Sequence, residues 1–567
     1  MKAKLLILGI VLATGIVVGA YPADVQTPSE APRLSEVERE IPEGTGFIPP
    51  RMDLSHLSGR EIPAKLKGTQ APQQFDCRQQ GWITPIKNQG ACGSCYAFAS
   101  IASFESLVLK DSSVTYDLSE NNAKECNFFD RSCGGGTFYD LASHFSQKGF
   151  VLESCDPYVP SDVICNTGCS HVKTLLDWRI ISANSVPATT VLQDYIYTYG
   201  PAYTTLYVGG TADPAWETEF QSYSGDYVLY HPTAEEPNHA VLIVGWDDTL
   251  SHAGGTGAWI VKNSWGTAWG GTCGYGAEAG YFYIAYGSGN IGMWSSFPND
   301  YQDYDLNGEI MYHDEGGWVT SWGYGSTTVW GLCKFVPSQD IDLTRVEFWT
   351  NDATTDIDVY IYDSFDGSST SGLLASKLDN SYSEAGYHSV ELDLPVEVSA
   401  ANDIFAVVII TNVSYTYPLI SDTGAGVTGI TYMSPSGSPG TWYDLGLNQD
   451  DDVAIRVRGS YPMAQSVEDE NEPGAKSYSL SQNHPNPFNL STTISFTLER
   501  QSPVSLIVYN LLGQKIKTLV EENRPAGTHY AQWDGHDHSG RPASTGVYFY
   551  QIKAGDFILT KKMILLK

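Results

Sequence analysis

Basic residues are scarce in this chain. It has 567 residues, of which 32 are Lys or Arg and 65 are Asp or Glu, so its formal net charge is −33. Proteins bind the phosphates of nucleic acids through clustered Lys and Arg, and a strongly acidic chain is repelled by them. The composition therefore argues against nucleic acid as a partner. We interpret the acidic excess as a property that keeps the protein soluble outside the cell.

Long apolar runs are also missing, with one exception at the start. Two lysines precede an apolar run over residues 5–19, which ends in small residues before Tyr21. A run of about 15 residues is shorter than the ~20 that a membrane-spanning helix needs, and this order of charged, apolar and small residues is typical of a secretory signal peptide. We therefore expect a signal peptide at residues 1–20 and a mature protein that is soluble or attached by other means.

Repeats of the solenoid type are absent, and the chain is too long for one ordinary domain. Residues 21–70 are rich in Pro, Glu and Ser and predict a mostly extended leader. Residues 71–300 hold the first helix-like pattern and most of the ten cysteines, which an exported chain can oxidise to disulfides. Residues 301–460 alternate short β-prone segments with turns, which predicts an antiparallel sandwich. Residues 461–477 form an acidic linker, and a second, smaller β-sandwich follows at residues 478–567.

The densest local signal surrounds Cys95, in Asn88-Gln-Gly-Ala-Cys-Gly-Ser-Cys-Tyr-Ala-Phe-Ala99. Small residues flank this cysteine, and apolar residues at helical spacing follow it. We therefore expect Cys95 at or near the N-terminus of a helix, where the helix dipole favours a negative charge. The thiolate is the nucleophilic form of cysteine, so this position suits a reactive thiol.

This segment resembles the nucleophile motif of the papain family of cysteine peptidases, Cys-Gly-Ser/Ala-Cys-Trp/Tyr, which is followed by His and Asn about 130–150 residues downstream. Here the motif is Cys92-Gly-Ser-Cys-Tyr96, with Tyr where the best-known members have Trp. His239 comes 144 residues after the cysteine, and Asn263 follows 24 residues later. The resemblance covers residues 71–286 and implies an α+β fold, with a helical half carrying Cys95 and a β half carrying the other two residues.

The resemblance implies a role for each matched residue. Cys95 is the nucleophile, His239 is its proton partner in a thiolate–imidazolium pair, and Asn263 orients the imidazole. Gln89 and the backbone N–H of Cys95 stabilise the oxyanion, and Trp265 shields the His–Asn bond from water. The implied substrate-binding positions are Gly135, Gly136, Thr137, Phe138 and Trp265, with Ala240 and Thr205 as weaker candidates. The implied disulfides are Cys92–Cys133 and Cys126–Cys165, while Cys77, Cys155, Cys169 and Cys273 have no assigned partners and Cys333 is expected to be free.

The leader departs from the family pattern, because the long helical propeptide of many members is missing. The segment Gly46-Phe-Ile-Pro-Pro-Arg-Met-Asp-Leu54 is expected to lie in the cleft as an extended inhibitor. We expect the mature enzyme to start near Ala71, and we treat removal of the leader by the enzyme itself as a hypothesis.

The first β-sandwich, residues 301–460, resembles the lectin-like domain found beside some bacterial papain-like peptidases. Two interpretations stay open: a carbohydrate- or surface-binding module, and a structural extension that packs on the peptidase. The aspartates at residues 363–366 and 450–452 are possible ligands for structural Ca²⁺, although solvated turns are the favoured interpretation. We expect no other cofactor or metal.

The last 90 residues resemble the C-terminal sorting domain of the type IX secretion system. The matching motifs include Asn483-His-Pro-Asn-Pro-Phe-Asn489, Tyr509-Asn-Leu-Leu-Gly-Gln-Lys515 and Ser544-Thr-Gly-Val-Tyr-Phe-Tyr550. The resemblance implies export across both membranes of a diderm bacterium by that machinery, followed by release or surface attachment. The alternative is an ordinary immunoglobulin-like module, as in the flagellar hook-cap family.

The predicted fold is thus a two-lobed α+β peptidase domain followed by two all-β sandwiches. The predicted function is that of a secreted cysteine endopeptidase acting on protein and peptide substrates through a thioester acyl-enzyme. One alternative is a surface adhesin that uses an inactive papain-like scaffold to bind carbohydrate. Another is a peptide ligase with the same triad.

Overall fold

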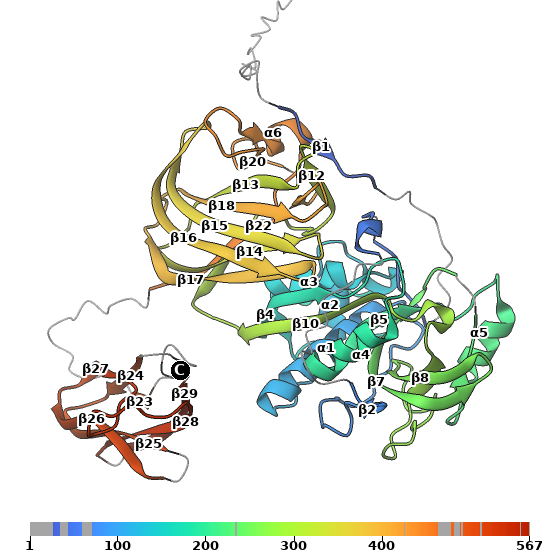
Figure 1. Cartoon of the computed structure of the whole chain (residues 1–567), viewed down its shortest axis with the longest axis horizontal. Helices are drawn as coiled ribbons and strands as arrows, with labels where there is room; N and C mark the ends of the chain where they lie inside the picture. The colour runs from blue at the N-terminus through green and yellow to red at the C-terminus, as the bar shows by residue number, and fades with distance from the viewer. Residues whose placement is uncertain are drawn as a thin grey trace, which may run out of the picture. The chain divides into compact units, whose positions relative to one another are not determined.

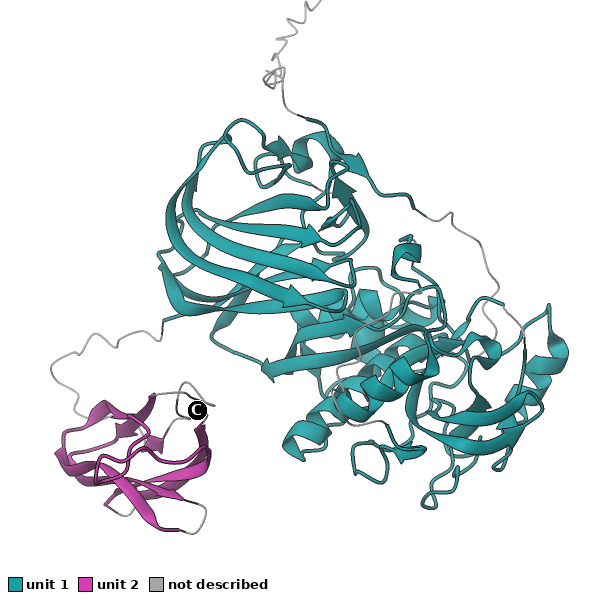
Figure 2. Ribbon diagram, in the orientation of Figure 1, with its two compact units in different colours: residues 1–462 teal, residues 463–567 magenta. Residues whose placement is uncertain are grey.

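The computed structural model describes residues 26–33, 44–50, 52–58, 71–232, 235–424, 426–462, 478–480, 483, 488, 491–510, 513–555 and 557–565. The chain divides into two compact units, residues 1–462 and 463–567 (Figure 2). The predicted signal peptide and nearly all of the predicted acidic linker lie outside the described residues. Within the described ranges, no helix combines the length and the apolar character that a bilayer crossing requires.

Helices gather in one half of the first domain (Figure 1). The long helix α1 (Cys95–Ser112) is buried along most of its length, and it ends where Ser113 turns into the left-handed conformation (φ 59°) and donates its N–H to the Leu109 carbonyl. Helix α3 (Phe138–Gln147) begins with a capping box between Thr137 and Asp140. The helix α2 (Glu120–Glu125) and the 3₁₀ turn η2 (Ser132–Gly134) complete this half.

The other half is built on a largely antiparallel sheet. Its central strands are β4 (His171–Ile180), β10 (Met293–Asp303), β5 (Ala202–Leu206), β7 (His239–His252), β8 (Gly255–Lys262) and β9 (Tyr281–Ala285), in that spatial order. Shorter elements complete it: β2 (Gln74–Asp76), β3 (Phe150–Val151), β6 (Val228–Leu229), η3 (Ser288–Asn290), α4 (Thr189–Tyr199) and α5 (Pro214–Gln221). The first eight residues of β7 are all buried, which fits the position of this strand inside the sheet, between β5 and β8.

The same sheet continues into the first β-sandwich. Strand β17 (Gly386–Val398) pairs with β4 through Gly386 with Arg179 and Tyr387 with Trp178. Beyond β17 follow β14 (Ile341–Thr350), β22 (Ile455–Ser460) and β11 (Gly308–Met311). The first domain and the sandwich domain therefore share one 13-stranded sheet, and β10 runs across the predicted boundary at residue 300.

A second sheet faces this extension and encloses the sandwich core. Its strands are β16 (Thr370–Tyr382), β15 (Thr355–Phe365), β18 (Ile404–Asn412), β13 (Thr328–Phe335), β20 (Thr431–Ser434) and β21 (Tyr443–Asp444), with α6 (Leu445–Gln449) following directly. A three-stranded sheet joins β12 (Thr320–Gly323) to β19 (Leu419–Ser421) and to a strand of the leader, β1 (Ser29–Glu30). The leader also forms the 3₁₀ turn η1 (Ser55–Leu57). The predicted antiparallel sandwich is confirmed.

Buried polar contacts join the sandwich domain to both halves of the first domain. Arg456 is fully buried and donates to both carboxylate oxygens of Asp314, and also to the hydroxyls of Ser143 and Ser146 on α3, at 2.8 and 2.7 Å. His388 of β17 lies 2.9 Å from the Asp177 carboxylate on β4. Removing one partner of a buried ion pair such as Arg456–Asp314 costs about 3–5 kcal/mol. The bonds from Arg456 to α3, the His388–Asp177 contact and the shared sheet hold the two domains together.

The second unit is a small antiparallel sandwich of its own. One sheet contains β23 (Ser479–Leu480), β24 (Thr492–Leu498) and β27 (Gly527–Trp533), and the other contains β26 (Lys515–Arg524), β25 (Ser502–Asn510), β28 (Gly546–Ala554) and β29 (Phe557–Leu565). Trp533 and Tyr550 are fully buried in its core. This matches the predicted all-β fold of the region.

Candidate active site

Cys95 is the first residue of α1, as the sequence predicts. Ser94, the residue before it, offers no side-chain cap to the helix. The backbone N–H groups of the first turn therefore point toward the region of the thiol, where they favour negative charge. The side chain is fully buried in this structure, which bears on its charge state below.

His239 and Asn263 come together because of the β7–β8 pairing. His239 is the first residue of β7, Asn263 follows the last residue of β8, and Leu242 opposes Lys262 in the ladder. Nε2 of the imidazole lies 2.8 Å from Oδ1 of Asn263. The same oxygen accepts the N–H of Ser264 at 2.8 Å, so the amide is fixed and the imidazole is oriented by it.

The start of β7 also places His239 beside the thiol. The N–H of Ala240 donates to Sγ of Cys95 at 3.3 Å. The other imidazole nitrogen, Nδ1 of His239, is buried and has no hydrogen-bond partner among the described residues. It is therefore the ring nitrogen left to exchange a proton with Cys95.

Burial keeps both groups uncharged in this state. Desolvation raises the pKa of Cys95 to about 12, against the opposing effect of the Ala240, Tyr96 and Cys95 N–H groups. Desolvation also lowers the pKa of His239 to about 4, while the bond to Asn263 acts to raise that pKa. A thiolate–imidazolium pair is therefore disfavoured while both groups are buried.

Gln89 is held by bonds at both ends of its side-chain amide. Its Nε2 donates to the Cys92 carbonyl at 2.8 Å, and its Oε1 accepts from the Ser264 hydroxyl at 2.5 Å. Nε2 also lies 3.4 Å from the carbonyl of Thr45 in the leader. A peptide carbonyl thus already sits beside the predicted oxyanion donor.

Trp265 covers the His–Asn bond. Its ring centroid lies 5.2 Å from that of His239 and 5.4 Å from that of Phe220. Its indole N–H donates to the Gly44 carbonyl of the leader at 2.7 Å. The side chain thus excludes water from one side and contacts a bound peptide on the other.

The leader runs through the cleft in an extended form. The N–H groups of Gly46 and Phe47 both lie close to the Asn238 carbonyl, at 3.2 and 3.1 Å. The Gly136 N–H donates to the Gly46 carbonyl at 2.9 Å, and its carbonyl accepts from Ile48 at 3.2 Å. This is a parallel bridge between residues 47 and 136.

Gly46 has to be glycine at this point. Its φ is +143°, and a Cβ added there would fall 2.0 Å from the carbonyl oxygen of Gly93. The leader backbone therefore lies directly against the nucleophile loop. Asn238, which binds this backbone, was not singled out by the sequence, although it immediately precedes the predicted histidine.

The predicted pocket residues lie around the leader in different ways. Phe47 is 4% exposed and belongs to one apolar cluster with Phe138 and Ala240. A Cβ on Gly135 would fall 3.0 Å from the Ile48 side chain. Thr137 has its hydroxyl committed to capping α3, where it accepts the Tyr139 N–H at 2.9 Å.

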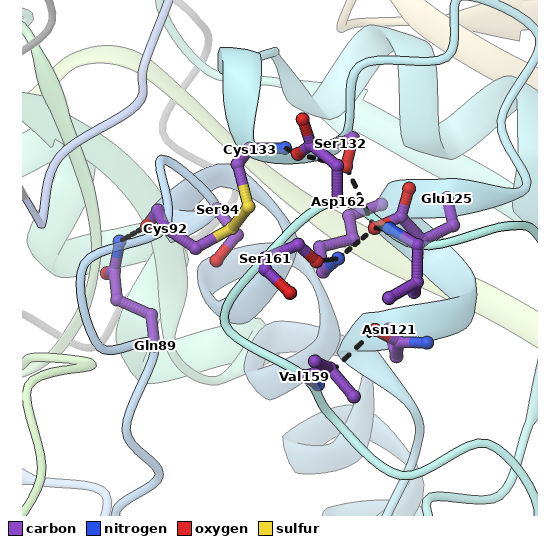
Figure 3. The surroundings of a disulfide bond; sticks show 12 residues. Gln89, Cys92, Ser94, Asn121, Glu125, Ser132, Cys133, Val159, Ser161 and Asp162 are labelled. Atoms are coloured by element: carbon purple, nitrogen blue, oxygen red, sulfur yellow. Dashed lines mark hydrogen bonds and ion pairs between the residues drawn. A yellow bond between two sulfur atoms is a disulfide. The ribbon is translucent and has the colours of Figure 1, made fainter.

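Disulfides brace the nucleophile loop and its neighbours (Figure 3). Cys92 and Cys133 are bonded, and Asp162 accepts the Cys133 N–H at 3.0 Å and the Ser132 hydroxyl at 2.7 Å. This pairing and Cys126–Cys165 are those that the resemblance implies. A third disulfide, Cys155–Cys169, was not assigned from sequence, and the free thiols are Cys77, Cys95, Cys273 and Cys333.

A buried charged cluster behind the site was also missed. Lys87 lies 3.0 Å from Glu105 of α1 and 2.9 Å from Glu120 of α2. Lys262, next to Asn263, is buried and donates to the Thr84 carbonyl at 2.7 Å, and burial lowers the pKa of Lys262 to about 8. The cluster ties the helical half to the end of β8. No motif marks these residues, because charged residues far apart in sequence meet only in the fold.

The aspartates considered for Ca²⁺ serve as hydrogen-bond acceptors. Asp366 accepts the backbone N–H groups of Ser368 and Ser369 at 2.9 and 2.7 Å, as in a tight turn. Asp451 accepts the Trp322 indole N–H at 2.9 Å. These bonds give both carboxylates a structural role.

Family models match three parts of the chain in order. Residues 71–297 match the papain family cysteine protease model, residues 310–456 the lectin-like domain, and residues 486–556 the FlgD immunoglobulin-like domain. The last match corresponds to the second interpretation of the C-terminal region, an immunoglobulin-like module.

Curated relatives cover the first of these parts. A cathepsin L-like proteinase of Fasciola hepatica is 30% identical over 242 residues, which is 42% of this chain and 67% of that protein. Cathepsin K of Mus musculus is 31% identical over 233 residues, which is 40% of this chain and 64% of that protein. The first of these is a proteinase by name.

A solved structure shares the arrangement of the first two domains. The cysteine protease and lectin-like domains of Cwp84, a surface layer associated protein of Clostridium difficile, superpose with a TM-score of 0.61. The alignment covers 78% of this chain and 100% of that one, at 19% identity. At that identity the likeness shows the fold: a papain-like α+β domain joined to a lectin-like β-sandwich.

Proposed function

Because the chain belongs to the papain family of cysteine proteases, we propose that it is an endopeptidase whose catalytic groups are Cys95, His239, Asn263 and Gln89. One observation carries the assignment. The hydrogen bonds from the imidazole of His239 to Oδ1 of Asn263, and from the N–H of Ala240 to the Cys95 sulfur, join the proposed triad across the two halves of the domain.

The proposed reaction uses these groups in sequence. The Cys95 proton passes to Nδ1 of His239, and the sulfur attacks the peptide carbonyl carbon. The oxyanion accepts hydrogen bonds from Nε2 of Gln89 and the N–H of Cys95. The carbon–nitrogen bond breaks as His239 gives its proton to the leaving amine, which leaves a thioester. Water, deprotonated by His239, then releases the acid and restores the thiol.

We further propose that the leader keeps the enzyme inactive until it is removed. Its backbone occupies the cleft at Gly136, Asn238 and Gln89, and with the leader in place Cys95 and His239 are buried, which disfavours their charged forms. Departure of the leader admits water, which lowers the pKa of the thiol and raises that of the imidazole. Removal by the enzyme itself predicts that a Cys95→Ala chain keeps its leader.

The other proposals concern location and attachment. The signal-like start of the sequence and the surface-associated relative Cwp84 support export to the cell surface or medium. The C-terminal motifs support a sorting role in type IX secretion. The shared sheet supports a structural role for the sandwich domain, and the lectin-like match leaves glycan binding as a second role.

The first experiment measures hydrolysis of a panel of fluorogenic dipeptides by the matured protein, with Cys95→Ala as control. We expect thiol-dependent cleavage that the substitution abolishes. A folded protein that cleaves nothing between pH 4 and 9 would overturn the proposal and favour the adhesin, which a glycan array then tests. Addition of amine acceptors separates hydrolysis from peptide ligation, because only a ligase converts most of the acyl group to a new amide.

A further inference from the structure

The leader contacts the sandwich domain as well as the cleft. Strand β1 pairs with β12, and the Ala31 N–H donates to the Ser321 carbonyl at 2.8 Å (Figure 1). Farther along the leader, the His56 ring stacks on Tyr415 with centroids 3.6 Å apart, and its Nε2 lies 2.6 Å from the Asn351 carbonyl oxygen. The sandwich domain thus binds two separate parts of the leader.

Apolar leader residues enter the core where the two domains meet. Met52 is 7% exposed and Leu54 is 2% exposed. Both belong to the cluster that contains Phe47, and this cluster draws on both domains. Its members from the sandwich domain include Trp318, Trp349, Ile420 and Ala454. One apolar cluster therefore extends from the residues around Cys95 to the sandwich domain.

The path has a definite direction relative to the proposed catalytic residues. From the Trp265 side the leader passes Gly136 at Phe47, continues through Met52 and Leu54 of the shared cluster, and reaches the sandwich at His56. By the papain resemblance, the Gly136 side receives the residues before the scissile bond. A substrate therefore runs in the direction opposite to the leader, and leader residues after Phe47 mark upstream substrate positions. Five extended residues span at most about 17 Å, so only a substrate with a long upstream segment reaches the sandwich.

Removal of the leader takes Phe47, Met52 and Leu54 out of this cluster. The apolar groups that these side chains cover in the uncut chain can then be buried again by another peptide of similar chemistry.

We propose that the sandwich domain supplies binding positions for the substrate. They take apolar side chains about five to nine residues upstream of the residue held at Gly136, in an extended polypeptide. This inference rests on the proposed peptidase function and adds a substrate class to it: long, extended, apolar segments rather than short peptides.

The test uses the matured full-length chain and two fluorogenic peptides. Both carry Phe two residues before the scissile bond. The longer peptide also carries leucines five and seven residues upstream of that Phe and an aromatic residue nine upstream. The variants are Tyr415→Ala, at the half-buried site under His56, and Ile420→Ala, in the shared cluster. Tyr362→Ala is the matched control, because Tyr362 packs on a different cluster.

We expect the longer peptide to have a kcat/KM at least about 10-fold higher, mainly through KM. Tyr415→Ala should reduce this preference at least about threefold and leave the short peptide unchanged, and Tyr362→Ala should alter neither. Ile420→Ala should act in the same way provided that its melting temperature is retained. Equal kcat/KM for the two peptides, or an equal loss for both in Tyr415→Ala, would overturn the inference.

Failure of the peptidase assignment would look different, because then neither peptide is cleaved. Binding decides the inference in that case. Fluorescence anisotropy measures the affinity of both peptides for matured protein whose Cys95 is blocked with a methylthio group. Tighter binding of the longer peptide that depends on Tyr415 supports the sandwich positions, and equal binding refutes them.

Discussion

Substitution of Gly46 by alanine should open the covered active site. The added Cβ would fall 2.0 Å from the Gly93 carbonyl oxygen, and both are backbone positions that cannot turn away. The leader must therefore lift, which breaks backbone hydrogen bonds at residues 46–48: two to Asn238 and two with Gly136. At about 1 kcal/mol each, loss of two to four bonds weakens the closed state by about 2–4 kcal/mol, a factor of roughly 30–1,000.

The assay is the rate at which a fluorescent thiol reagent modifies Cys95 in the uncut chain. A His239→Ala background prevents cleavage during the measurement, and a Cys95→Ala chain corrects for the other thiols. Gly81→Ala is the matched control, because Gly81 also has a positive φ, +74°, but a Cβ there meets nothing within 4 Å. Labelling of Gly46→Ala that is no faster than that of Gly81→Ala would refute the reasoning.

The remaining predictions concern the oxyanion site, the thiol and the domain junction. Gln89→Ala should lower kcat about 10²–10³-fold with little change in KM, and equal losses from Gln89→Ala and a surface substitution would contradict its role. In the uncut chain the labelling rate of Cys95 should still rise above pH 9, because burial raises the pKa of the thiol to about 12; the matured enzyme should reach its plateau nearer neutrality. Arg456→Met should cost about 3–5 kcal/mol of stability by leaving Asp314 unpaired, and adding Asp314→Leu should restore most of the melting temperature.

The sequence predicted the local features of the site well. Small residues around Cys95 followed by helical spacing predict the start of α1, and the structure has that start at the same residue. The β-prone run after His239 predicts a strand, and β7 begins there. Short-range patterns suffice for these features, because helix starts and strand alternation are fixed by neighbouring residues.

Contacts between residues far apart in the sequence could not be predicted in the same way. The Cys155–Cys169 bond was left open, because spacing alone does not determine which cysteines meet. The pairing of β4 with β17 joins residues about 200 positions apart, and no local sequence pattern predicts it. The catalytic role of Cys95, His239, Asn263 and Gln89 stays a prediction, supported by geometry and awaiting the kinetic tests.

The junction between β4 and β17 also decides how this protein can be shortened. A chain cut after residue 300 would lose β17, and the backbone groups of Trp178 and Arg179 that pair with it would face water. Unpaired strand edges of this kind invite pairing with other chains and aggregation. The cut would also remove His388, the hydrogen-bond partner of the Asp177 carboxylate. We therefore expect the proteolytic domain to stay soluble only when it is produced together with its sandwich domain, and we expect the two to be inherited together.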